Sequence, residues 1–158
     1  MQRMKRIGLL LTVGSALALA GCYSSMPGNT SIAPTVSGLW MVTFTPTTQG
    51  AASTTFTVNF SQNGSTLSGT VTAVNNPASS CFPLVTQQST FTVSGQAVSQ
   101  SQSMSNLTLS LGFMSGSSNG TIMGTGALAY LGTMANGTFS FAGGSSGCTS
   151  GTFSMSQG

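Results

Sequence analysis

Acidic residues and histidine are absent from this chain of 158 residues, and lysine and arginine together number only three. The three basic residues, Arg3, Lys5 and Arg6, all lie within the first six positions. General acid–base catalysis and the activation of a serine nucleophile rely mainly on His, Asp, Glu or Lys, and none of these follows residue 6. Zinc, calcium and magnesium sites need clustered Cys, His or carboxylate ligands. The composition therefore predicts a protein that is not an enzyme, holds no metal or cofactor and, lacking a basic patch, binds no nucleic acid.

The first 21 residues have the pattern of a secretory signal peptide. A short basic head precedes an apolar run over 7–20, which is too short to span a bilayer and ends in small residues. A helix retained in the membrane is the alternative, but it needs about 20 apolar residues. The polar segment 23–31 begins too soon for that, which favours a cleaved peptide.

The end of the apolar run, Leu19-Ala20-Gly21-Cys22, resembles the lipobox of bacterial lipoproteins. The resemblance implies cleavage before Cys22 and acylation of its thiol, and two or three acyl chains anchor a protein stably to a membrane. In Gram-negative lipoproteins an Asp after the lipidated Cys marks retention in the inner membrane. Tyr23 stands there instead, which implies the outer membrane, facing the periplasm or the cell surface. The alternative is a soluble secreted protein in which Cys22 has no such role.

Two cysteines, Cys81 and Cys148, remain once Cys22 is assigned to lipid. In an oxidising compartment two remaining cysteines most simply form one disulfide. A reactive thiol is the alternative, but no cationic side chain is present in the mature chain to activate it. We therefore predict a Cys81–Cys148 bridge.

The mature chain divides into a tether over 22–37 and a single domain over 38–158. The tether is rich in Ser, Pro and small polar residues and shows no periodicity. From residue 38 onward, apolar or Gly positions alternate with Thr, Ser and Asn in eight runs, a pattern typical of half-buried antiparallel strands. The predicted inward positions are Trp40, Val42 and Phe44; Phe56, Val58 and Phe60; Leu67, Gly69, Val71 and Ala73; Phe91, Val93 and Gly95; Leu107, Leu109, Leu111 and Phe113; Ile122, Gly124, Gly126 and Leu128; Ala135, Gly137, Phe139 and Phe141; and Gly151, Phe153 and Met155.

The turns and the edges of the sheet suggest its architecture. Asn63-Gly64 and Asn119-Gly120 predict type I′ hairpin turns, whereas Asn136-Gly137 fits either a turn or a strand. Short strands joined by tight turns favour an up-and-down meander. Sheet edges are usually protected by charge, which this domain lacks, and a barrel has no edges. We predict an all-β, closed barrel of about eight antiparallel strands, with a two-sheet sandwich as the alternative.

Gly38-Leu39-Trp40 resembles the G-x-W that opens the first strand of lipocalin- and avidin-like barrels, the calycins. In that family the Trp closes one end of the barrel, and the interior or mouth often binds a small molecule. The resemblance is limited to this motif and to strand patterns. Lipocalins stack an Arg from a late strand on this Trp, and no Arg follows residue 6 here.

Two functional hypotheses follow. In the first, the barrel binds a small neutral or apolar molecule near its mouth, at Trp40, Phe56, Phe91, Tyr130 and Phe141. In the second, these aromatic residues are only the core, and the protein is a structural or surface-interaction lipoprotein that contacts an envelope component through its Ser/Thr face. Both assign the membrane as a partner through the acyl chains on Cys22.

The stability of the oxidised mature protein should be nearly independent of pH between about 4 and 9. Acid denaturation mostly reflects protonation of native carboxylates and charging of buried His, and the mature chain has neither kind of side chain. Thermal melts across this range test the expectation. A shift of the midpoint by more than a few degrees would contradict it.

Overall fold

The computed structural model describes residues 34–76, 81–82, 85–86, 89–99, 104–116, 118–129, 132–143 and 148–158. The regular elements within these ranges are all β-strands. In chain order they are β1 (Gly38–Pro46), β2 (Thr54–Asn63), β3 (Thr66–Asn75), β4 (Thr90–Ser99), β5 (Met104–Ser115), β6 (Ser118–Ala129), β7 (Met134–Ala142) and β8 (Ser150–Gln157).

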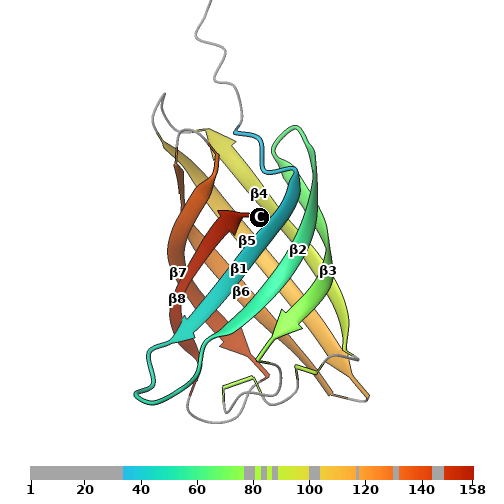
Figure 1. Ribbon diagram of the computed structural model, residues 1–158, viewed down its shortest axis with the longest axis vertical. Coiled ribbons are helices and arrows are strands. Elements are labelled where there is room, and N and C mark those ends of the chain that lie inside the picture. Colours follow the sequence, from blue (N-terminus) through green and yellow to red (C-terminus); the bar gives the residue numbers. More distant parts are fainter. Residues whose placement is uncertain are drawn as a thin grey trace, which may run out of the picture. The chain divides into compact units, whose positions relative to one another are not determined.

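The eight strands form a closed antiparallel barrel (Figure 1). Each strand pairs with the next in sequence, and β8 pairs with β1 from Trp40–Gln157 to Pro46–Gly151. The predicted all-β, up-and-down barrel is confirmed, and the alternative, a two-sheet sandwich, is wrong. Closure leaves neither β1 nor β8 with an unpaired edge.

The predicted alternation places side chains correctly along most strands, with one exception in β3. Thr57 of β2 pairs with Ala73, but Val58 pairs with Val71, so Thr72 is an extra residue. Such a β-bulge shifts the in-and-out alternation by one position. Ala73, predicted to point inward, is therefore exposed, and Val74 is buried instead.

The predicted turns are only partly correct. Asn63 pairs with Thr66, and Gly64 between them has a φ of 59°, so the chain does turn there. Asn63 itself has no positive φ, so the turn centres on Gly64 and the following residue and is not the type I′ turn expected.

The turn predicted at Asn119-Gly120 is wrong. Gly120 lies within β6 and pairs with Phe113 of β5, and the chain turns earlier, at Gly116, whose φ is 62°. Asn136-Gly137, for which the sequence left two options, lies within β7.

The connections lie at two ends of the barrel. The chain enters at residues 34–37, and this end, at the top of Figure 1, also holds the Gly64 turn; we call it the entry end. The opposite end holds the β1–β2, β3–β4 and β7–β8 connections and the Gly116 turn; we call it the disulfide end. β1, β3, β5 and β7 run from the entry end to the disulfide end, and the other strands run back.

Replacing Gly137 by Ala should destabilise the barrel more than replacing Gly124. A Cβ at Gly137 would overlap the backbone oxygen of Thr125 and lie 2.5 Å from the Cα of Gly126 and 2.6 Å from the Phe153 ring. A Cβ at Gly124 would meet only that ring, no closer than 3.2 Å. We expect Gly137→Ala to lower the free energy of unfolding by about 1–3 kcal/mol or more, the usual range for overpacking, and Gly124→Ala by less.

Urea denaturation of the two variants beside the parent measures this difference. Equal midpoints for Gly137→Ala and Gly124→Ala would mean that β6 and β7 are not held at the observed separation.

Candidate functional site

Phenylalanine rings fill the barrel interior toward the disulfide end. The ring centroid of Phe44 lies 5.7 Å from that of Phe56 and 5.2 Å from that of Phe139, both in edge-to-face geometry, and 6.1 Å from that of Phe153. All four side chains are at most 3% exposed. Aromatic pairs of this kind contribute about 0.5–1.5 kcal/mol beyond their area burial. The chain's own side chains thus occupy the interior at this end.

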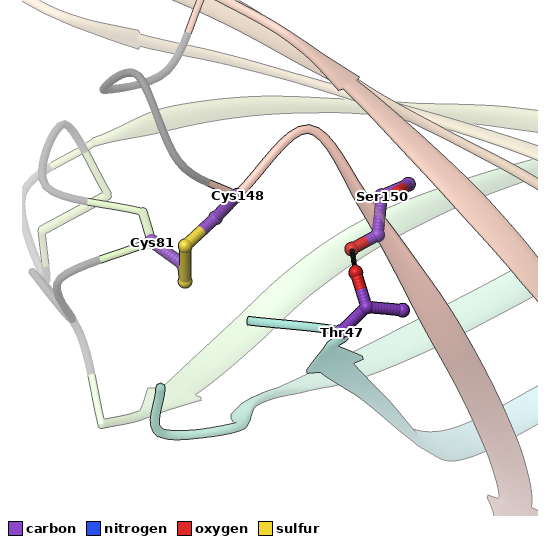
Figure 2. Close-up of a disulfide and its surroundings, with 4 residues drawn as sticks. All are labelled: Thr47, Cys81, Cys148 and Ser150. Atoms are coloured by element: carbon purple, nitrogen blue, oxygen red, sulfur yellow. Dashed lines mark hydrogen bonds between the residues drawn. A yellow bond between two sulfur atoms is a disulfide. The ribbon is translucent and has the colours of Figure 1, made fainter. Parts of the chain in front are cut away.

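At the disulfide end, the described part of the β3–β4 connection contributes a side chain to the core. Phe82, in this connection, is fully buried, and its ring centroid lies 5.2–6.5 Å from those of three interior phenylalanines. The preceding residue, Cys81, is bonded to Cys148 of the β7–β8 connection, with 5.0 Å between the two Cα atoms (Figure 2). The predicted disulfide is therefore present. It links residues 67 apart in sequence, and the chain-entropy model gives about 4 kcal/mol for a loop of that length.

Two hydrogen bonds join the start of the β1–β2 connection to β8 at the disulfide end. The Thr47 hydroxyl, just after β1, donates to the backbone oxygen of Ser150 at 3.2 Å (Figure 2). The Thr47 backbone N–H donates to the same oxygen at 3.1 Å. The start of the β1–β2 connection is thus held against the start of β8, two residues after Cys148.

Trp40 lies inside the barrel near the entry end with an unpaired polar atom. Its side chain is fully buried, and no atom among the described residues accepts a hydrogen bond from its indole N–H. A buried donor without a partner costs about 1–3 kcal/mol. Trp40 is the one buried side chain of the described residues that retains such an unused hydrogen-bonding group.

The segment that enters the barrel is held by Gln62 of β2. The Gln62 side-chain oxygen accepts a hydrogen bond from the Val36 backbone N–H at 2.6 Å, and its Nε2 donates to the backbone oxygens of Pro34 at 2.9 Å and Gly64 at 2.8 Å. The Val36 side chain is fully buried in the core. The segment that precedes β1 is therefore fixed to the barrel at the entry end.

The structure distributes the predicted ligand residues over both ends of the barrel. Phe56 and Phe91 contact each other, with 5.8 Å between ring centroids, and Phe141 stacks on another ring toward the same disulfide end. Trp40 is near the entry end. Tyr130 lies outside the described residues. These residues therefore do not outline one common mouth.

On the outer face of the barrel, the Ser/Thr face expected from the sequence forms two rows of hydroxyl groups that are aligned across neighbouring strands. In the first row, five threonines on five neighbouring strands pair directly with one another, and neighbouring strands lie about 4.8 Å apart. All five are exposed. We call this row the threonine stripe; it consists of Thr45, Thr152, Thr138, Thr125 and Thr108 on β1, β8, β7, β6 and β5. A second row, of serines, crosses β2 to β5 and consists of Ser61, Ser68, Ser94 and Ser110.

A shallow groove of about 480 Å³ lies over β4 to β7 toward the disulfide end. Its lining combines hydroxyl and amide groups from Thr92, Asn119 and Thr121 with the exposed side chain of Met114. Gly112 leaves space in the groove, because a Cβ at this position would lie 2.6 Å from the Thr92 hydroxyl oxygen. The groove can offer neutral hydrogen bonds and a small apolar contact, and it has no charge.

The described part of the chain contains no cluster of three or more His, Cys, Asp or Glu side chains that could hold a metal ion. It also contains no helix long and apolar enough to cross a membrane. The lipobox and Cys22 lie outside the described residues.

The comparisons with known proteins add no relationship. No protein-family model, curated protein or solved structure matches this chain.

Proposed function

We propose that the mature protein is a non-catalytic, lipid-anchored protein of the outer membrane whose filled barrel serves as a structural or surface-interaction module. The observation that supports this best is the division of the barrel into two regions. The interior at the disulfide end is occupied by phenylalanine rings in mutual contact, whereas the outer face carries rows of exposed hydroxyl groups. What is available for contact is therefore the outside.

The outer face suits an aqueous environment and a neutral partner. Outward positions of β7 and β8, such as Asn136, Thr138, Thr152 and Ser154, are exposed and polar. A barrel that crosses a membrane instead presents an apolar band to lipid. Aligned hydroxyls donate and accept hydrogen bonds without charge, so a glycan or an uncharged protein surface of the envelope fits this face better than a charged polymer does.

The chemistry of the chain supports a non-catalytic role. Each described hydroxyl lacks a neighbouring His, carboxylate or Lys to act as its base, because the chain has none of these after residue 6. The two described cysteines, Cys81 and Cys148, are joined to each other and are not available as nucleophiles.

The anchor can be tested by changing the two residues that specify it. In the native host, Cys22→Ala should abolish incorporation of labelled palmitate, and mass spectrometry of the parent should find an acylated Cys22 as the N-terminal residue. Tyr23→Asp should keep the label but move the protein from the outer-membrane to the inner-membrane fraction. Ser24→Ala serves as the matched control and should behave as the parent. Palmitate label that persists in Cys22→Ala would exclude the proposed anchor.

A second function, the binding of a small neutral molecule, is favoured by the unpaired indole N–H of Trp40. A ligand with a carbonyl or ether oxygen could accept this hydrogen bond at the entry end and remove the cost of the unpaired donor. On β2, Trp40 pairs with Val58, which is buried and apolar. On β8 it pairs with the exposed Gln157, two residues beyond the buried Met155, so the inner part of the ligand would be apolar and its outer part would meet an amide group.

Trp40 is the sole tryptophan of the chain, so its emission reports directly on this site. Titration with a long-chain methyl ketone should shift the emission if the site accepts such a ligand, and the alkane of equal length, which cannot accept a hydrogen bond, should have a smaller effect. Unchanged emission with both compounds would exclude ligand binding at Trp40, and only the structural or surface-interaction function would remain.

A further inference from the structure

The exposed apolar side chains of the barrel are concentrated at the entry end. Six large hydrophobic side chains of the described residues are about half exposed. Met123 lies midway along β6, and Met114 lies near the end of β5, at the disulfide end. The other four belong to the entry end, and we call them the apolar rim; they are Leu39, Met41, Val98 and Met134.

Three members of the apolar rim are neighbours on one side of the barrel. Ser156 of β8 pairs with Met41 on one side and with Met134 on the other, so the two methionines flank a single small residue. Leu39 lies two residues before Met41 and points to the same face of β1. Val98 lies near the end of β4, across the barrel at the same end.

We infer that the apolar rim rests against the lipid bilayer, so that the barrel stands with its entry end on the membrane and its disulfide end pointing away. This rests on the proposed function, because it requires lipid on Cys22. Cys22 and Pro34 are 12 residues apart in sequence, and at about 3.3–3.6 Å per residue the tether reaches at most about 40–43 Å. Gln62 fixes the other end of the tether at the entry end. The anchor is thus attached to the barrel at the same end as the rim.

The contact would depend on apolar burial alone. No described residue has a charged side chain, so no side chain of the rim is attracted to or repelled by anionic headgroups. Peripheral proteins commonly combine apolar burial with Lys and Arg, and their binding then depends on lipid charge and salt. Here the orientation should be the same on neutral and anionic membranes and at low and high salt.

The orientation would decide which surfaces a partner can reach. The rim and the Gly64 turn would lie near the headgroups. The groove over β4 to β7 lies toward the opposite end and would face outward, as would the closed disulfide end.

Site-specific labels on the acylated full chain test the orientation. Cys22 is acylated and Cys81 is bonded to Cys148, so one introduced cysteine is the only free thiol. Met41→Cys and Met134→Cys place an environment-sensitive fluorophore on the rim, and Met114→Cys is the matched control, an exposed methionine at the far end. The labelled proteins are reconstituted in phosphatidylcholine vesicles, with and without brominated lipid, and then in vesicles with added phosphatidylglycerol.

We expect brominated lipid to quench the labels at positions 41 and 134 but not the label at 114. In the vesicles, acrylamide should quench the two rim labels about twofold less than the label at position 114, because the bilayer covers the exposed face of the rim side chains. The result should not change with phosphatidylglycerol or with high salt.

Three results would overturn the inference, and they are distinguishable. If the protein floats with the vesicles but the rim and control labels respond alike, the anchor stands and the orientation is wrong. If the rim labels are shielded from acrylamide without quenching by brominated lipid, a second copy of the chain covers the rim instead. If the protein does not float with the vesicles at all, the proposed anchor fails, and the orientation fails with it.

Discussion

The pairing of β1 with β8 is the constraint on which the rest of the structure depends. Closure gives both strands a partner along their length, from Trp40–Gln157 to Pro46–Gly151, in a domain that has no charge to protect a free edge. It also places Phe44 directly opposite Phe153, which creates the centre of the aromatic core. The start of β8 is brought beside the end of β1 in the same way, so that the disulfide and the Thr47 hydrogen bond can form at one end. An open sheet would lose all of these at once.

The sequence was sufficient to predict the strands, because a period of two fixes which face each side chain takes. It was sufficient to predict the closed barrel, because the domain has no charge with which to protect a sheet edge. It failed where register is decided by packing and not by local preference. Asn119-Gly120 has the residues of a hairpin turn, but Gly120 lies opposite Phe113, and a Cβ there would be 2.5 Å from that ring. The pairing of a large with a small residue kept Gly120 in the strand. The bulge at Thr72 escaped prediction for a similar reason, since nothing local marks it.

The candidate surfaces were less predictable than the fold. Alternation assigned Phe56 and Trp40, which are buried, and Phe91, which is partly buried against the core, to the inside correctly. It does not give the position of a residue along the barrel axis, so residues from both ends were grouped as one mouth. The threonine stripe depends on four strand registers together, and no single segment contains that information. Phe82 lies in a connection without periodicity. The cysteine count pointed to its neighbour, Cys81, but not to the ring that covers the core.

The absence of charge has a kinetic consequence that connects the outer face to the anchor. Electrostatic steering raises association rates well above the roughly 10⁵–10⁶ M⁻¹s⁻¹ typical of uncharged surfaces, and no described side chain of this barrel can supply it. A neutral surface of hydroxyl rows must instead find its partner by unassisted diffusion and hold it through hydrogen bonds that salt does not screen. Tethering compensates for this, because confinement near the membrane raises the effective concentration of any partner in the same layer. The proposed lipid on Cys22 and the uncharged face would therefore be complementary: the anchor would supply proximity, and the threonine stripe and groove would supply contacts that stay the same when salt or pH changes.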